Sequence, residues 1–298
     1  MIISKFAGLS VLATVSIFAL TGCAAGTPAA EETAASSIAV DEAAAALLPE
    51  QYKDGVSVAS DIPYAPMEFF DENDNPTGFD YDLSQAIAAK LGVTFTFNDQ
   101  DWDGIIPSLQ SGTHDIIMSG MNDTVERQKV LDFVDYFSAG FAVIVAKGNP
   151  EGINNFADLC GKTVAIQTAT SQIDLINAVN PSCTDKIEVL EFPSDGDAQN
   201  AIRAGKAVAG VNDGQVAAYT AQTAGDGEYF ELVTPSDAPE GYTSVLTGIG
   251  ILKANTGLTA AIQAAVQSLI DDGTYASLLE KWNLSAFAVT EATINGTK

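Results

Sequence analysis

The stretch from Phe79 to Gly92, FDYDLSQAIAAKLG, decides the fold. Its apolar residues recur at the spacing of one helix face, and Gly92 stands where helices commonly end in the left-handed conformation. Short strand-like runs lie on both sides of it, at residues 56–59 and 93–97. A strand, a helix and a further strand in this order are typical of an α/β domain with parallel strands and crossover helices.

The alternation of strands and helices continues in two series. The first series is expected to continue with a helix at 105–110, a strand at 115–118 and a helix at 124–130. The second is expected to begin with a helix near Phe156 and to contain strands at 163–167, 188–192 and 207–211 and helices at 171–179 and 197–204.

Two long β-type segments, 141–146 and 245–252, flank the second series. The chain therefore leaves the first domain and later returns to it, and two such connections make a hinge. The closing stretch 256–282 is expected to form one or two helices, interrupted at 271–275.

The charge of the chain is strongly acidic. It has 13 Lys and Arg against 39 Asp and Glu, a formal net charge of −26. Such a chain repels phosphate backbones, so we expect no nucleic-acid partner. A length of 298 residues with 47% hydrophobic residues is ample for buried cores.

The N-terminus reads as a secretory signal, residues 1–22. Lys5 precedes the apolar run from Phe6 to Leu20, which is shorter than the ~20 residues of a membrane-spanning helix. Leu20-Thr-Gly-Cys23 resembles a bacterial lipobox, which implies lipidation of Cys23 and a lipid anchor. The alternative is an ordinary signal peptide with an incidental cysteine.

Residues 23–54 are then expected to be the lipidated N-terminus and a flexible tether, because residues 24–48 are rich in Ala and contain no aromatic residue. Anchor and tether together predict a location at the cell membrane, on its extracytoplasmic face.

With Cys23 assigned to lipid, Cys160 and Cys183 remain as an even pair in an oxidising compartment, where a disulfide is expected. Two free buried cysteines are the alternative. No metal site is expected, because the only histidine, His114, lies far from both cysteines in the sequence.

Several strings taken together are similar to the family 3 extracellular solute-binding proteins, which deliver polar amino acids to ABC importers. They are ASDIPYAPMEFFDENDNPTGFDYDLSQAIAAKLG (59–92), DWDGIIPSLQSGTHDIIMSGMNDTVERQKVLDF (101–133), GKTVAIQTATSQ (161–172), GKAVAGVNDGQVAAY (205–219) and the ending TGIGILKAN…IDDGTYASLLEKW. The resemblance covers about residues 55–285. Its most specific part is Gly78–Leu83, in which Tyr81 stands where an aliphatic residue is usual.

The resemblance implies a two-lobed α/β fold of the periplasmic-binding-protein type II class with two hinge crossovers. Lobe 1 would comprise residues 55–140 and 246–285, lobe 2 residues 141–245, and residues 286–298 a tail. It also implies an amino acid ligand captured between the lobes, a membrane permease as partner, a monomer, and no cofactor.

Arg127, one of two arginines in the chain, falls on the arginine of the family's Thr-x-x-Arg motif, which grips the α-carboxylate of the ligand. Its planar fork matches two carboxylate oxygens at once. For an isolated arginine the usual alternative is a surface ion pair between Glu and Arg on a helix.

The family resemblance implies further pocket residues on both lobes. Ser119, Gly120 and Asn122 match positions that hydrogen-bond the ligand, and Thr170 with Ser171 resembles a turn that opens a helix of lobe 2, where Ala169 replaces the usual glycine. Asp213 matches the carboxylate that pairs with the ligand's ammonium group. Its alternative role is that of a turn residue at the end of a strand.

Asp61, Tyr64 and Trp102 match the pocket wall of the family. An aromatic pair with a carboxylate favours a cationic amino acid, because ring faces attract guanidinium and ammonium groups. Asp61 is frequent in the family whatever the ligand, and a tryptophan also packs on uncharged side chains, so glutamine or another polar amino acid is the alternative.

Two other functions fit the same fold: a ligand-sensing lipoprotein and a periplasmic dehydratase-like enzyme. A lytic transglycosylase also carries such a lobe. The sequence contains no cysteine and histidine pairing, no Gly-rich phosphate loop and no metal-spaced cluster, so a binding protein and not an enzyme is expected.

Overall fold

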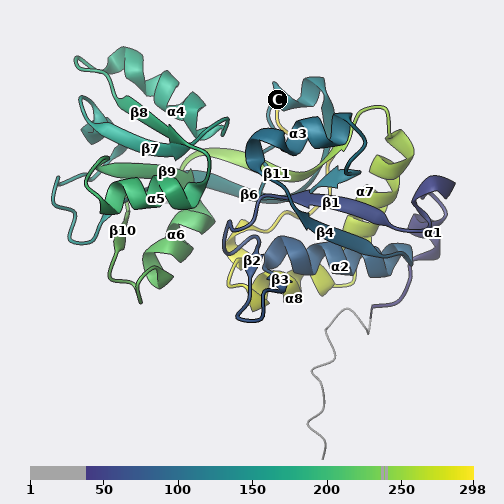
Figure 1. The fold of residues 1–298 in the computed structure, drawn as a ribbon. Helices are drawn as coiled ribbons and strands as arrows, with labels where there is room; N and C mark the ends of the chain where they lie inside the picture. Colours follow the sequence, from purple (N-terminus) through teal and green to yellow (C-terminus); the bar gives the residue numbers. More distant parts are fainter. Residues whose placement is uncertain (1–37, 236–237, 239–240) are drawn as a thin grey trace, which may run out of the picture. The chain divides into compact units, whose positions relative to one another are not determined.

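The structure is a computed structural model that describes residues 38–235, 238 and 241–298, all within the compact unit Ala34–Lys298 (Figure 1). The predicted signal peptide, Cys23 and the tether up to residue 37 lie outside the described residues. In the part of the chain that is described, no helix is both long enough and apolar enough to span a membrane.

Nine of the described strands form one mixed sheet in the order β4-β1-β5-β11-β6-β9-β7-β8, with β10 paired to β6. A short hairpin, β2 with β3, stands apart from this sheet. The strands are β1 (Val56–Ser60), β2 (Phe69–Phe70), β3 (Pro76–Thr77), β4 (Phe95–Asp99), β5 (Ile116–Ile117), β6 (Leu131–Ala146), β7 (Thr163–Gln167), β8 (Glu188–Phe192), β9 (Ala209–Asp213), β10 (Phe230–Val233) and β11 (Tyr242–Leu252).

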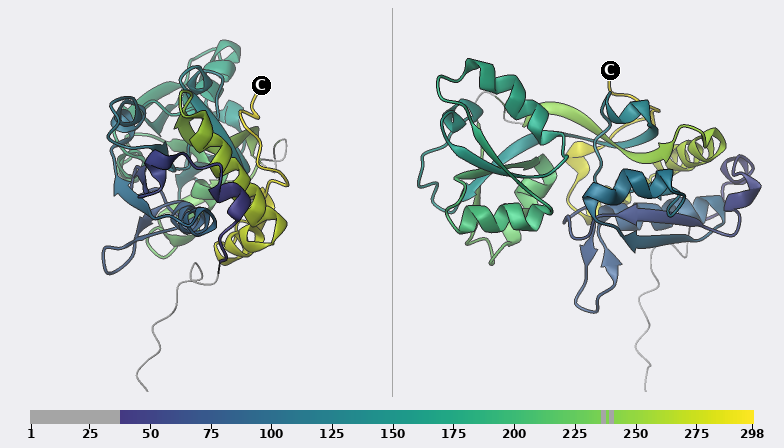
Figure 2. Two further views of the ribbon diagram at one scale, coloured as in Figure 1. Left: turned by 90° about the vertical axis from the view of Figure 1, so that its right-hand side faces the viewer. Right: turned by 45° about the horizontal axis from the view of Figure 1, so that its top comes forward.

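The sheet contains two parallel sets joined by two long antiparallel strands. In lobe 1, β1 pairs in parallel with β4 and β5; in lobe 2, β7 pairs in parallel with β8 and β9. β6 and β11 pair with each other and pass side by side from one set to the other (Figure 2). The predicted α/β fold with two lobes and two crossovers is confirmed.

The helices cover both parallel sets, as crossover connections require. α1 packs against α2 and α7, and α2 also packs against α7 and α8. The helices are α1 (Glu42–Ala45), α2 (Phe79–Leu91), α3 (Trp102–Gln110), α4 (Gln172–Val179), α5 (Asp195–Arg203), α6 (Gly214–Thr223), α7 (Thr256–Asp271) and α8 (Thr274–Lys281).

α2 begins directly after a glycine that no other residue replaces without a clash. Gly78 has a φ of 122°, and a Cβ there would lie 2.3 Å from the carbonyl oxygen of Met67. Within α2, Asp82 accepts hydrogen bonds from Lys281 Nζ at 2.7 Å and from the indole Nε1 of Trp282 at 2.6 Å. These two bonds tie α2 to the end of α8.

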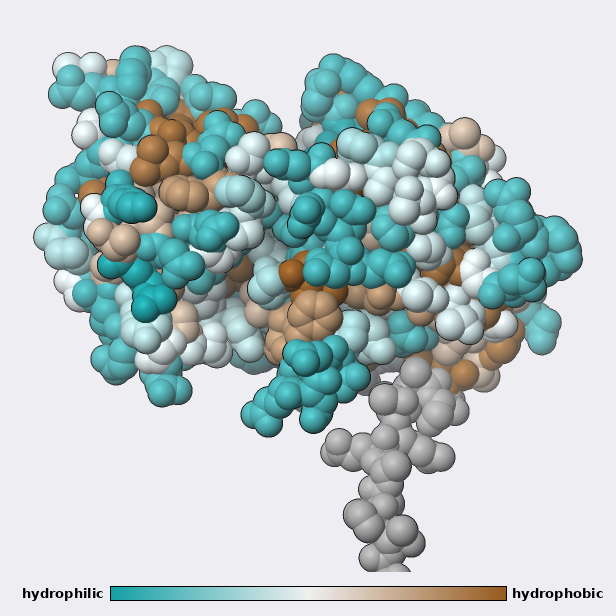
Figure 3. Space-filling model, in the orientation of Figure 1, coloured by the Kyte–Doolittle hydropathy of each residue, from teal (hydrophilic) through white to brown (hydrophobic). Residues whose placement is uncertain are grey.

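Separate apolar cores support the two lobes. Phe79 and Leu83 of α2 are fully buried together with Ile262 of α7 in a core of lobe 1. Val164 of β7 and Ile176 of α4 lie in a different core, in lobe 2. The face of the molecule drawn in Figure 3 is mostly hydrophilic, which fits a folded unit whose apolar side chains are buried.

Residues 41–52 form ordered elements and pack on lobe 1, which shortens the predicted tether of 23–54. Asp41 caps α1 by accepting from the backbone N–H groups of Ala43 and Ala44. Leu48 and Tyr52 are buried in the core of lobe 1. Apolar side chains in the Ala-rich stretch therefore bind it to the domain.

Two predicted helices are only 3₁₀ turns. The helix expected at 124–130 is reduced to the turn Arg127–Lys129, and the one near Phe156 to the turn Phe156–Leu159. Residues 124–130 lack an apolar stripe to bury, and Val125 and Val130 are exposed. The turn is short because little apolar packing supports a longer helix there.

Cys160 and Cys183 form a disulfide within lobe 2, with their Cα atoms 5.4 Å apart. Cys183 is buried beside Val164 and Ile187 in the core of that lobe. The bond closes a loop with a sequence separation of 23 residues.

We predict that the exported protein carries this bond, so that its non-reduced form is lighter by two hydrogen atoms in intact mass spectrometry. The Cys160→Ser, Cys183→Ser double variant should lose about 3 kcal/mol of unfolding free energy, because the unfolded chain regains the freedom of the closed loop. Two alkylatable thiols in the denatured, unreduced protein would contradict the prediction.

Candidate functional site

A pocket lies where the carboxyl ends of two strands from each parallel set meet. β1 ends just before Asp61, β5 ends at Ile117, two residues before Ser119, and β7 and β9 end at Gln167 and Asp213. In α/β sheets, ligands bind at these strand ends. The residues that line the pocket are Asp61, Tyr64, Trp102, Ser119, Gly120, Asn122, Arg127, Gln167, Thr170, Ser171, Gln172 and Asp213.

All ten residues that the sequence predicts as ligand-binding are among these twelve. They come from both lobes and line a single pocket. The structure thus brings all ten residues to one pocket, and their role there remains a prediction.

Arg127 contributes the guanidinium group of the pocket. Its Nη1 donates to the backbone oxygen of Asn122 at 2.9 Å, and its Nη2 donates to the backbone oxygen of Ala169 at 3.2 Å. The guanidinium carbon lies 5.2 Å from the centre of the Trp102 ring. Burial lowers the pKa of Arg127 to about 10, against the opposing attraction of Asp213, so the group remains charged at neutral pH.

The surface ion pair that served as the alternative for Arg127 is not formed among the described residues. The neighbouring acid Glu126 pairs with Lys129. Arg127 instead donates to two backbone carbonyl oxygens, one from each lobe. Its full charge is therefore not neutralised by a direct carboxylate partner.

Asp213 contributes a buried carboxylate from the end of β9. Its Oδ2 accepts from the Tyr64 hydroxyl at 2.7 Å, and its Oδ1 accepts from Asn122 Nδ2 at 3.3 Å. Burial raises the pKa of Asp213 to about 6, although these hydrogen bonds and the charge of Arg127 act in the opposite direction. Both donors come from lobe 1, so this carboxylate connects the two lobes.

Asn122 bridges the lobes at the centre of the pocket. Its side-chain oxygen accepts from the hydroxyl of Ser171, the residue that precedes α4. Its Nδ2 also approaches Thr247 Oγ1 of β11 at 3.4 Å. One amide side chain therefore contacts lobe 2 through Ser171 and Asp213 and contacts the crossover strand β11 through Thr247.

Asp61 provides a second carboxylate, at the other side of the pocket. Its Oδ2 accepts from Gln167 Nε2 at 2.7 Å, and Gln167 also donates to the backbone oxygen of Pro193 at 3.1 Å. Burial raises the pKa of Asp61 to about 6, with Gln167 opposing the shift. The Thr170 hydroxyl donates to the Gln167 backbone oxygen at 2.7 Å, which fixes the turn before α4.

Buried carboxyl groups support the pocket from behind. Glu68 accepts from the Ser119 hydroxyl at 2.7 Å, and Asp80 accepts from the Gly120 backbone N–H at 2.8 Å and from the Tyr136 hydroxyl at 2.7 Å. Burial, with repulsion from Asp80, raises the pKa of Glu68 well above its usual range. Ser119 and Gly120 are thus held by groups deeper in lobe 1.

The pocket residue Gly120 and Ala169, the neighbour of the pocket residue Thr170, have backbone conformations that favour glycine. Gly120 has a φ of 52°, and a Cβ there would lie 2.9 Å from the ring of Tyr64. Ala169 also has a positive φ, 59°, so it keeps the left-handed conformation although it carries a Cβ. This conformation directs its carbonyl oxygen to Arg127 Nη2 and to Trp102 Nε1, at 3.2 and 3.4 Å.

Sequence reasoning missed two pocket residues, Gln167 and Gln172. Gln167 is the last residue of β7, and the rule that ligands bind at carboxyl ends would have indicated it. Gln172 opens α4 directly after the predicted pair Thr170 and Ser171. It is 4% exposed, and its Oε1 has no hydrogen-bond partner among the described residues.

The arrangement suits a small zwitterion. Arg127 offers donors for a carboxylate, whereas Asp213, with the free acceptor of Gln172 and the carboxylate of Asp61, offers acceptors for cationic groups. A ligand with one carboxylate and one ammonium group would satisfy charges of opposite sign in the same pocket.

Residues 56–285 match the bacterial extracellular solute-binding proteins, family 3. The chain is 31% identical over 247 residues to the arginine-binding protein ArgT of Corynebacterium glutamicum, covering 80% of this chain and 78% of the relative.

Two solved structures are similar as well. One is an ancestral arginine-binding protein bound to glutamine, with 36% identity and a TM-score of 0.70 over 78% of this chain and 99% of that chain. The other is an ancestral amino acid-binding protein described as a precursor of cyclohexadienyl dehydratase, with 36% identity and a TM-score of 0.67 over 76% of this chain and 94% of that chain.

Proposed function

Because the chain belongs to the bacterial extracellular solute-binding proteins of family 3, we propose that it captures a polar amino acid between its lobes and delivers it to an ABC import permease. Lobe 1 comprises residues 55–140 and 246–285 in this proposal, and lobe 2 residues 141–245. The protein acts as a monomer in this proposal, and closure of the lobes on the ligand presents the loaded form to the permease.

The observation that carries the proposal is the presence of Arg127 and Asp213 in one pocket, one from each lobe. In this proposal, Arg127 binds the α-carboxylate through both arms of its fork, and Asp213 binds the α-ammonium group. The remaining hydrogen bonds to these two groups come from Ser119, Gly120, Asn122, Thr170 and Ser171. Each lobe then contributes one of the two charges that a zwitterion requires.

The side chain of the ligand lies, in the same proposal, between Tyr64 and Trp102 and ends near Asp61. A cationic side chain is favoured, since the groups that hydrogen-bond Asp61, the Gln167 amide and the Trp102 backbone, are neutral, and Asp61 has no cationic partner among the described residues. The similarity to the arginine-binding proteins supports this choice. Glutamine remains the second candidate, because a similar ancestral protein has been solved with glutamine bound.

A binding protein is favoured over an enzyme, because the named relatives bind amino acids. The similar precursor of a dehydratase is itself described as an amino acid-binding protein. The proposal requires that the protein return its ligand unchanged, and a nuclear magnetic resonance spectrum of L-arginine kept with stoichiometric protein should show no new species.

We predict that Cys23 carries the lipid anchor, since Leu20-Thr-Gly-Cys23 follows the apolar run of the signal. Cells that express the wild type with a fatty acid analogue should yield labelled protein in the membrane fraction, and Cys23→Ser should be unlabelled. An unlabelled wild type would contradict the anchor without affecting the proposed ligand site.

We predict that Arg127→Ala weakens binding of the best amino acid ligand by about 10-fold to 100-fold, since a charge-assisted hydrogen bond contributes roughly 1.5–3 kcal/mol. Arg127→Lys should also bind well below wild type, because it keeps the charge and loses the fork. Calorimetry measures both. Wild-type affinity in both variants would place the ligand elsewhere, and a large loss of stability without ligand would indicate a structural arginine.

We predict that the affinity for an amino acid ligand decreases as the pH is lowered, and that the decrease is larger for a ligand with more cationic groups. Asp213 and Asp61 each have a pKa of about 6, so each is about nine-tenths protonated at pH 5. Between pH 7.5 and 5, glutamine should lose about 10-fold in affinity and arginine about 100-fold, because only arginine uses both carboxylates. Asp213→Asn should remove the pH dependence for glutamine.

The stability of the ligand-free protein provides the control. A folded pKa above the ordinary value of 3.8 means that the folded state binds more protons than the unfolded state in this range. As pH falls from 7 toward 5, these groups therefore increase the free energy of unfolding of the ligand-free protein, whereas they decrease its affinity for the ligand. Equal losses of affinity for both ligands would exclude Asp61 as the group that binds the side-chain cation.

A further inference from the structure

Residues 293–297, which we call the C-terminal strap, lie along an edge of β6. The backbone N–H of Asp135 donates to the Thr293 carbonyl oxygen at 2.9 Å, and the backbone N–H of Asn295 donates to the Phe133 carbonyl oxygen at 3.0 Å. Ile294 forms an antiparallel bridge with Val134. This part of β6 pairs with β11 on its other side, and β9 pairs with β6 only from Phe141 onward. The strap thus covers a part of the β6 edge that β9 does not reach.

The strap follows the part of the chain that matches the family, residues 56–285, so that match assigns it no role. Apolar burial and hydrogen bonds attach the chain before it. Ala292 is buried, its N–H donates to Gln267 Oε1 at 3.0 Å, and its carbonyl accepts from Gln263 Nε2 at 2.9 Å. Both ends of the strap are therefore held against lobe 1.

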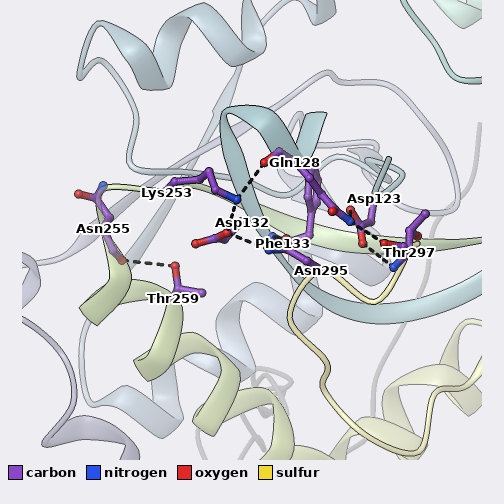
Figure 4. Close-up of polar contacts among 9 residues, drawn as sticks. All are labelled: Asp123, Gln128, Asp132, Phe133, Lys253, Asn255, Thr259, Asn295 and Thr297. Atoms are coloured by element: carbon purple, nitrogen blue, oxygen red, sulfur yellow. Dashed lines mark hydrogen bonds and ion pairs between the residues drawn. The ribbon is translucent and has the colours of Figure 1, made fainter. Parts of the chain in front are cut away.

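Beyond this edge, the strap reaches the loop that carries Arg127 (Figure 4). Asp123 is fully buried, and its Oδ2 accepts from the Thr297 backbone N–H at 3.0 Å. Its Oδ1 accepts from Gln128 Nε2 at 2.8 Å, and the same Nε2 donates to the Thr297 carbonyl oxygen at 3.0 Å. Asp123, Gln128 and the Thr297 backbone therefore form one closed set of hydrogen bonds.

These bonds fix the residues directly beside two pocket groups. Asp123 follows Asn122, and Gln128 follows Arg127. From the other side, Lys253 Nζ donates to the Gln128 carbonyl oxygen at 2.9 Å and to Asp132 Oδ1 at 3.0 Å (Figure 4). Asn295 Nδ2 donates to the same Asp132 oxygen at 2.9 Å. Both ends of the short loop 123–128 are thus braced through groups that contact the strap.

We propose that the C-terminal strap positions Arg127, the residue that binds the α-carboxylate of the ligand in the proposed function. The Thr297 backbone orients Arg127 through Asp123 and Gln128. The inference rests on the proposed function of Arg127. A two-pronged guanidinium contact requires close alignment, because small displacements of a positioned group cost much of its interaction. A solely structural role, the protection of a sheet edge, is the competing explanation.

Thr297→Pro tests the proposal, because proline removes the N–H that Asp123 accepts. Thr297→Ala is the matched control, since it keeps the backbone donor and acceptor and the Thr297 side chain forms none of the bonds described. Calorimetry on the full chain uses L-arginine and L-glutamine as probes. Thr297→Pro should weaken both by the same factor, about threefold to 10-fold, because the α-carboxylate is common to both, whereas Thr297→Ala should stay within about twofold of wild type.

A double-mutant cycle locates the effect. In the Arg127→Lys background, Thr297→Pro should cost less than about twofold, because the fork that the strap orients is already absent. An undiminished loss in that background would overturn the proposal. Unequal losses of affinity for the two probes would also overturn it. Unchanged affinity with a lowered thermal midpoint would overturn it too, and would indicate that the strap only protects the edge of the sheet.

Gln128→Met keeps the length of the side chain and removes its donor, so it replaces Thr297→Pro in the same cycle if the proline variant does not fold. Failure of the proposed function is detected separately, when the wild type binds none of the twenty amino acids. Hydrogen exchange without ligand then decides: Thr297→Pro must speed exchange of the amides of residues 123–128 relative to Thr297→Ala, and unchanged rates would overturn the brace.

Discussion

The antiparallel pairing of β6 with β11 is the interaction on which the rest of the structure depends. β11 pairs with β5 of the first parallel set, and the register of β6 with β11 runs from Leu131 opposite Leu252 to Phe141 opposite Tyr242. β6 continues into the second set by pairing with β9. Because the same two strands belong to both lobes, the carboxyl ends of β1 and β5 meet those of β7 and β9 at one pocket.

The pocket that results holds charged groups of both signs that form no direct ion pair with each other. A protein with a net charge of −26 places one of its two arginines there, and that arginine makes no direct ion pair among the described residues. The carboxylates of Asp61 and Asp213 are bonded by neutral amide and hydroxyl groups. Neutral partners solvate these charges without cancelling them, so the charges stay available to a ligand.

Local signals in the sequence predicted much of the fold and the pocket membership. The helix at 79–92 and the strands at 163–167 and 188–192 carry clear periodicity and turn signals, and the structure has all three. The family motif indicated Arg127 and Asp213, which line the pocket. These residues lie at strand ends or in tight turns, where local sequence and position in the fold are directly coupled.

The elements that sequence reasoning missed depend on contacts between distant segments. Leu48 and Tyr52 pack on lobe 1, although composition alone indicated a tether. The segment after residue 285 was expected to be a tail, yet Asn295 and Thr297 bond to Phe133 and Asp123, more than 150 residues earlier. Hydrogen bonds made by backbone groups leave no signature in residue type, so sequence patterns do not indicate them.

The two tryptophans occupy different positions with respect to the pocket. Trp102 lies in its wall, stacked near Arg127, with its indole N–H directed to the Ala169 carbonyl oxygen of the opposite lobe. Trp282 lies outside the pocket lining, bonded to Asp82 and edge-on to Phe69. The intrinsic fluorescence of the protein therefore combines a reporter that senses both lobes with an internal reference fixed within lobe 1, so the protein needs no added dye to follow their separation.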